Sequence, residues 1–292
     1  MPVHETVYRR YGADRPAGGR SAILAVASYA VIGHRSGWLY KFARYASFVP
    51  PLVVGGILYI TNQASAGFAP ATTDPVLLRE QYAGPAFAYF GVQLFFNTFF
   101  IAIAGGPVVA EDLRRHALEL YFSKPIRPLE YAVGKWLGVF QAVSGAMTAP
   151  IAVAGGLLLA FAPGGFAAYG DLVLRGIVAG TFAAAVSSLV VLGVSSTGRS
   201  GRYAVVLWFV VSFFTHLASK VLVAATGEGA FAAFSFRDEI RVVAARIMDV
   251  PWDPGRPGEE PPSGYVCLGA LVAWCLAAVA ALRFRLKGAA RA

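Results

Sequence analysis

The sequence predicts an all-α integral membrane protein with six transmembrane helices. Of its 292 residues, 57% are hydrophobic and 14% are charged, and the mean hydropathy is +0.59. A soluble domain of this length could not bury that much apolar surface in one core. The apolar residues also form blocks of about 20 residues, the length that crosses a bilayer as a helix. These two observations exclude a soluble enzyme or binding domain.

The first 44 residues are predicted to form a cytoplasmic tail and an interfacial helix. Residues 1–20 are polar, basic and rich in glycine and proline, without the apolar core of a secretory signal. Residues 21–32 are apolar but too short to cross a bilayer. Together with the aromatic and basic residues up to Arg44, they indicate one or two helices lying in the headgroup region. A buried hairpin is the alternative.

The transmembrane domain is predicted over residues 45–285, followed by a tail at 286–292. The predicted spans cover residues 45–61, 84–110, 131–161, 172–194, 203–225 and 265–282. The third exceeds the bilayer thickness, so it must tilt or break near Pro150. A loop is expected at 62–83. Residues 226–264 are predicted to lie outside the cell, with a short amphipathic helix from Phe236 to Met248.

The basic residues predict the orientation of the chain in the membrane. The net charge is +9, and most of the 25 lysines and arginines lie before the first span, in the connection 111–135 or at the C-terminus. Positive flanks stay in the cytoplasm, so both termini and this connection are predicted to be cytoplasmic in the plasma membrane. Because these charges flank apolar blocks, they indicate membrane orientation and not a nucleic-acid partner.

The connection after the second span carries a dense mixture of opposite charges. A helix is predicted from Ala110 to Phe122, with Leu113 and other apolar residues on one face. Its charged face holds Glu111, Asp112, Arg115 and Glu119. Pro125 ends the helix because proline lacks an amide hydrogen and disfavours helical angles in the preceding residue. The sequence therefore predicts a short charged helix and a stiff elbow at the membrane surface.

The familiar motifs of catalysis and nucleotide binding are missing from this sequence. It has no GxxxxGK[ST] loop, no HExxH and no GxSxG. Cys267 and Cys275 lie in one apolar block without metal-site spacing, which indicates reduced, packed side chains. We therefore expect no catalytic residue, cofactor or metal in this chain, and we expect it not to be an enzyme.

Two polar pairs lie within or near the predicted spans. Gln93 and Asn97 are four residues apart, as are His216 and Lys220. Polar groups are costly in a membrane and often line a pathway, which makes Gln93, Asn97 and His216 candidate pathway residues. The structural alternative is an interhelical hydrogen bond for the first pair. For the second pair it is a lysine reaching the outer interface.

The run from Glu111-Asp112 through Leu120-Tyr-Phe-Ser-Lys-Pro-Ile-Arg-Pro-Leu-Glu-Tyr131 to Gly134-Lys135 resembles the cytoplasmic loop of ABC-2-type transporter permeases. That loop carries an acidic pair, a short helix, a turn containing a basic residue, proline and an aliphatic residue, and then an acidic residue and Gly-Lys. Pro128 and Lys124 depart from the usual residues. The resemblance covers about 25 residues, and elsewhere only the layout of spans agrees.

The resemblance implies that residues 111–130 form a coupling helix docked on a separate ABC ATPase subunit. The implied contact residues are Glu111, Asp112, Arg114, Arg115, Glu119, Ser123, Lys124, Pro125 and Glu130. It also implies a second permease chain, identical or not, and a role in export driven by ATP hydrolysis in the partner. Besides these proteins, the lipid bilayer is the expected surrounding.

Two other classes of function remain open. An ion-coupled secondary transporter needs an ionisable residue deep in a span and often has an internal repeat. Asp171, Arg175 and Lys220 lie near predicted span ends, and no repeat is visible. An integral membrane enzyme would need clustered acidic or histidine residues, whereas the four histidines are scattered. Aromatic and small residues in the spans suit a lipid-like cargo, but they also suit helix packing.

Overall fold

The structure is a computed structural model that describes residues 20–30, 37–65, 74–122, 126–198, 200–252 and 263–289. These residues are helical apart from short links, and no strand occurs among them. Within these ranges, six helical stretches are long and apolar enough to cross a membrane, the number that the sequence predicted. The predicted all-α class is therefore confirmed for the described residues, whereas the interfacial role of the N-terminal helix and the coupling role of residues 111–130 stay predictions.

The helices follow one another with short connections in the described ranges. Their bounds are α1 Arg20–Tyr29, α3 Trp38–Ala46, α4 Val49–Ser65, α5 Pro75–Arg114, α6 Ala117–Phe122, α7 Pro128–Phe161, α8 Gly165–Thr197, α9 Gly201–Phe209, the π-helix η1 Val210–Phe214, α10 Thr215–Thr226, the 3₁₀-helix η2 Gly229–Phe234, α11 Phe236–Met248 and α12 Gly264–Ala289.

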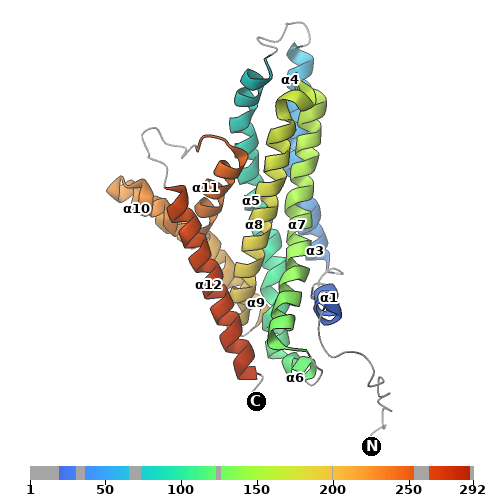
Figure 1. Cartoon of the computed structure of the whole chain (residues 1–292), viewed down its shortest axis with the longest axis vertical. Helices are drawn as coiled ribbons and strands as arrows, with labels where there is room; N and C mark the ends of the chain where they lie inside the picture. The colour runs from blue at the N-terminus through green and yellow to red at the C-terminus, as the bar shows by residue number, and fades with distance from the viewer. Residues whose placement is uncertain are drawn as a thin grey trace, which may run out of the picture.

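Four upright helices, α4, α5, α7 and α8, form the tall part of the molecule in Figure 1. The helix α12 slants across the lower part of this bundle and packs on α8, while α10 diverges to the side. At 1.5 Å per residue, the 40 residues of α5 extend for about 60 Å, twice the hydrocarbon thickness of about 30 Å. The helix α5 is therefore longer than the bilayer is thick, as are α7 with 34 residues and α8 with 33.

The first two spans begin earlier than predicted. The first apolar stretch starts at Trp38, because α3 continues into α4 across a short turn, so the predicted boundary at residue 44 falls within this stretch. The helix α5 starts at Pro75 and takes up much of the predicted loop 62–83. Asp74 caps it by accepting a hydrogen bond from the Val76 amide at 2.9 Å, and proline suits the first helical position.

The third span does not break at Pro150, because a neighbouring helix repairs the defect. Proline cannot donate to the carbonyl four residues earlier, which is that of Ala146. The side-chain amide of Gln93 on α5 donates to this oxygen at 3.0 Å. The α7 helix is therefore continuous through Pro150.

The fifth span differs from the predicted regular helix, whereas the short helix after it matches its prediction. The π-helix η1 interrupts the span at Val210–Phe214 and is followed by α10. The helix α11 covers Phe236–Met248, as predicted, and Ser235 caps it by accepting from the Asp238 amide at 3.1 Å. However, α11 packs against α8 and α12 and is largely buried. Its burial makes it part of the bundle.

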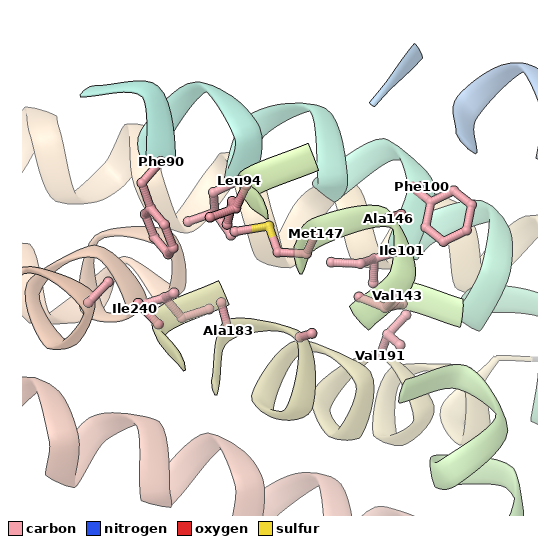
Figure 2. Close-up of a cluster of buried hydrophobic side chains, with 14 of the residues drawn as sticks. Phe90, Leu94, Phe100, Ile101, Val143, Ala146, Met147, Ala183, Val191 and Ile240 are labelled. Carbon is pink, nitrogen blue, oxygen red and sulfur yellow. The ribbon is translucent and has the colours of Figure 1, made fainter. Parts of the chain in front are cut away.

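The core lies where α5, α7, α8 and α11 meet. Figure 2 shows Phe90 and Leu94 of α5, Met147 of α7, Ala183 of α8 and Ile240 of α11 converging there. Small residues let the helices approach closely, and in a membrane such packing replaces the hydrophobic effect as the main source of helix association. A Cβ atom added at Gly105 of α5 would lie 2.4 Å from Val191 of α8.

Candidate functional site

The predicted charged helix from Ala110 to Phe122 is wrong in one respect, because the chain turns in its middle. The helix α5 continues to Arg114 and α6 begins at Ala117. Between them, His116 has a φ of 54°, in the left-handed region that a right-handed helix cannot contain. The turn separates α6 from α5 and directs Leu118 into a buried position.

A buried ion pair joins the end of α5 to the start of α7. The Asp112 carboxylate lies 2.7 Å from the Lys135 Nζ, and these side chains are 18% and 5% exposed. The Tyr131 hydroxyl donates to the same carboxylate at 2.6 Å. The Lys135 ammonium also lies over the rings of Tyr121 and Tyr131, at 5.6 and 5.4 Å. Asp112 therefore faces inward and not, as predicted, with the exposed charges.

A small apolar core holds α6 against three other helices. It consists of Val26 of α1, Leu118 of α6, Tyr131 of α7 and Leu286 of α12, all nearly inaccessible to solvent. Figure 1 places α6, α1 and the end of α12 together at the lower end of the molecule. A displacement of α6 would therefore strain α1, α7 and α12 as well as α5.

Glu111 pairs with two exposed arginines where α5 ends and α6 begins, a region that we call the α5–α6 corner. Its carboxylate lies 2.7 Å from Arg114 and 3.2 Å from Arg115. The side chain of Arg115 is 70% exposed and that of Arg114 is half exposed, so both guanidinium groups remain accessible to a partner. Exposed pairs of this kind contribute about 0–1 kcal/mol to stability.

The structure describes some of the remaining residues that were predicted to contact an ATPase, but not all of them. Glu130 accepts from the Arg127 amide at 2.9 Å and so caps the start of α7. Glu119 lies in α6, but its side chain is outside the described set. Ser123, Lys124 and Pro125 lie outside the described residues, so the predicted elbow is not tested.

Ser195 of α8 bridges the turn of α5 that runs from Gly106 to Ala110. Its hydroxyl oxygen accepts from the amides of Val109 and Ala110, each at 3.0 Å, and donates to the Gly106 carbonyl at 2.6 Å. Ser195 is fully buried. The last turns of α5, which lead to the α5–α6 corner, are therefore joined to α8 by hydrogen bonds.

A second polar site lies around the start of α11, where the sequence predicted an extracellular helix. The His216 Nδ1 of α10 lies 2.9 Å from the Asp238 carboxylate and 3.3 Å from the Ser235 hydroxyl. Burial acts to raise the pKa of Asp238, but the hydrogen bond and charge of His216, together with the charges of Lys220 and Arg241, outweigh it, so that this pKa is lowered. His216 thus anchors α10 to α11.

Two arginines surround this acidic residue on α11. Arg237 donates to the Gly91 carbonyl at 3.3 Å and lies over the Phe95 ring. Arg241 lies 3.8 Å from Asp238 and over the rings of Phe87 and Trp252. Burial lowers the pKa of Arg237, and the nearby Arg241 charge adds to this effect. These residues, with the neighbouring Glu239, make α11 a charged helix inside the bundle.

Gln93 and Asn97 are both buried within the bundle. Gln93 makes the interhelical hydrogen bond to Ala146 and accepts from the Tyr89 hydroxyl at 3.4 Å. This is the structural alternative that the sequence left open. The Asn97 Oδ1 has no hydrogen-bond partner among the described residues.

An apolar cavity of about 80 Å³ lies between α4, α5, α7 and α8. Its lining includes Leu58, Tyr82, Phe90, Leu158 and Leu172. The cavity offers apolar contacts to a ligand but few polar groups to orient one. It therefore identifies no chemical class of substrate.

Sequence reasoning missed Lys135 and Tyr131 as partners of Asp112, and it missed the buried charges of α11. Lys135 closes the quoted motif, but only the fold shows that the end of α5 returns against α7. For α11 the helical period was visible, whereas the burial of its acidic residues depends on α8 and α12. No family model matches this sequence, and no curated protein matches it.

Proposed function

We propose that this chain is the permease subunit of an ABC transporter and works as an exporter. The energy comes from ATP hydrolysed by a separate ATPase subunit that docks on residues 111–130. Three features support the proposal: six apolar spans, the resemblance of the segment 111–135 to ABC-2-type permeases, and the construction of the α5–α6 corner.

The buried Asp112–Lys135 pair is the observation that carries the proposal. It locks the end of α5 to α7, and the Lys135 ammonium also lies over the Tyr121 ring of α6. Leu118 holds α6 against α1, α7 and α12. Arg114 and Arg115 stay accessible on the outer side of the same corner. A rigid protrusion with an accessible charged surface can receive force from a docked protein and pass it to several spans.

The mechanism follows from these connections. When the two ATPase subunits close on ATP, the groove that holds α6 moves. The helix α6 then displaces α7 through the contacts of Leu118 and Tyr121 with Tyr131, and the ion pair makes α5 and α7 move together. Ser195 carries the displacement of α5 into α8. Two permease chains arranged around a shared path then alternate their access between the two sides of the membrane.

Reversing the two exposed arginines tests this function. Charges across such an interface set the choice of partner, and loss of one desolvated partner can cost about 2–5 kcal/mol. Arg114→Glu with Arg115→Glu should therefore weaken ATPase binding tenfold or more, measured by co-purification at defined concentrations in mild detergent. Because both side chains are exposed, folding and membrane insertion should be unchanged.

Arg114→Lys with Arg115→Lys is the matched control, since it keeps the charge and should retain most of the binding. The function would be contradicted if the purified chain hydrolysed ATP by itself. It would also be contradicted if the unmodified chain recovered no ABC ATPase.

A second candidate is an ion-coupled secondary transporter, which the buried acidic residues Asp238 and Glu239 of α11 favour. It predicts substrate uptake or efflux in proteoliposomes driven by an ion gradient without ATP. The ABC function predicts none under those conditions.

A further inference from the structure

Glu239 is an acidic residue sealed inside the bundle. It lies on α11, which contacts α8 and α12, and it is 0% exposed. Among the described residues, no group meets hydrogen-bond geometry with either of its carboxylate oxygens. Buried polar groups in folded proteins are almost always paired, so an unpaired carboxyl requires a physical explanation.

Among the described residues, no positively charged group acts on Glu239. From α12, the indole of Trp274 favours the charged form of Glu239, while Cys267 is a neighbouring thiol. On α11 itself, the adjacent Asp238 charge disfavours a second negative charge. The surroundings of Glu239 therefore oppose its ionisation.

The other charged groups around α11 act elsewhere. His216 and Lys220 of α10, with Arg241, favour the charged form of Asp238, and Arg237 donates to the Gly91 carbonyl of α5. The charged residues of α5 and α8 that reach α11 gather at its opposite end, around Asp249. They are Arg79, Asp171 and Arg175. The short helices η1 and η2 carry no charged residue.

Two adjacent acidic residues therefore have opposite protonation states. Burial of Glu239 raises its pKa from 4.5 to about 8, while Asp238 is held as the anion beside His216. An isolated carboxylate is costly to bury, and such a group takes up a proton instead. Paired acids whose environments separate their pKa values mark sites of proton binding.

We propose that Glu239 is a proton-binding site, occupied while α11 is packed between α8 and α12 and emptied when that packing opens to water. In the packed state the group is a neutral carboxylic acid. On opening, the O–H bond breaks, the proton passes to water and the carboxylate becomes hydrated. Closing reverses each step, so proton uptake is coupled to the docking of α11. The site does not depend on an ATPase partner.

Infrared difference spectroscopy of the purified protein in lipid tests the site directly. As the pH rises from 5 to 10, the carbonyl band of one protonated carboxylic acid should disappear with a midpoint near 8. Glu239→Gln, which has nearly the shape of the neutral acid, should lack this band. Glu228→Gln alters an exposed glutamate before α11 and should keep it.

The proposal is overturned if every carboxyl group of the unmodified protein titrates near its ordinary pKa, or if Glu239→Gln retains the band. The titration of the unmodified protein is decisive even if a variant folds poorly. It is also independent of ATPase binding, so a failed proton site and a failed ABC function give different results.

Thiol labelling tests the coupling to α11. Cys267 of α12 is buried beside Glu239, and a Cys275→Ser background leaves it as the single thiol. Above pH 8, labelling of Cys267 should become several-fold faster than in Glu239→Gln at the same pH. A negative charge on Glu239 disfavours the thiolate, so faster labelling reports the opening of the packing and not a more reactive thiol. Equal rates in the two proteins would overturn the coupling.

Discussion

Single polar side chains join neighbouring helices of this protein by hydrogen bonds to backbone groups. Gln93 donates to the Ala146 carbonyl that Pro150 leaves without a helical donor, and Ser195 joins α8 to the turn of α5 after Pro107. In a bilayer, no water is available to take these roles, so a neighbouring helix supplies them.

The Asp112–Lys135 pair gives the first prediction. Lys135→Met leaves the Asp112 carboxylate in a largely buried position without its cation, and breaking a buried pair in this way costs about 3–5 kcal/mol. We expect the free energy of unfolding to fall by about 3 kcal/mol, the lower end of that range, because the Asp112 side chain is still 18% exposed. Thermal or denaturant unfolding in detergent measures the change.

Arg115→Met is the control for this experiment. It breaks the exposed contact between Arg115 and Glu111, which is worth less than about 1 kcal/mol. Similar losses in both variants would show that the buried pair has no special role in holding the corner.

Glu239 gives a prediction for the pH dependence of stability. Below pH 4.5 the group is protonated in both the folded and the unfolded chain. Between 4.5 and about 8 only the folded chain keeps the proton, so the free energy of unfolding falls as the pH rises through this window. Glu239→Gln should remove this contribution. Unfolding measurements on the two proteins from pH 5 to 9 give the free energy of unfolding at each pH. The same pH dependence in both proteins would refute the prediction.

Among the helices, the sequence predicted the bounds of α11 best and the conformation of the α5–α6 corner worst. The bounds of α11 follow from a capping serine and an amphipathic period, both of which are local. The turn at His116 depends on Leu118 reaching the small core formed with α1, α7 and α12. Contacts between distant segments decide that conformation, so the local pattern of charges predicted one helix.

The packing of α1 on α7 gives a prediction about these two elements. A Cβ at Gly138 would lie 2.5 Å from the Ala27 carbonyl oxygen and 2.6 Å from the Ala30 Cβ. Gly138→Ala should therefore destabilise the protein by about 1–3 kcal/mol through overpacking and make α1 more sensitive to limited proteolysis.

Gly145→Ala is the matched control on the same helix, because a Cβ there meets nothing within 4 Å. Its effect should be neutral or a gain of up to about 1 kcal/mol from helix propensity. If Gly138→Ala behaved like this control, α1 would not be packed on α7 in the membrane.

At the scale of the whole molecule, composition and periodicity were sufficient for the class and the number of spans. They failed on the start of the second span, and they did not place the charges of α11 inside the bundle. Both failures have one cause, because the length of a helix and the burial of its side chains depend on which other helices surround it. The contact residues at 123–125 and the orientation of the termini stay predictions.

Photocrosslinking in native membranes shows whether an ATPase subunit docks beside α6. A photoreactive residue at Arg115, whose side chain is 70% exposed beside α6, should form an adduct with an ABC ATPase subunit. The same residue at Asp74, at the opposite end of α5 in Figure 1, should not. An ATPase adduct at position 115 alone is the predicted result. An adduct from position 74 would contradict the docking of an ATPase subunit at the α5–α6 corner. So would the absence of an adduct from position 115 in a chain that is folded and inserted.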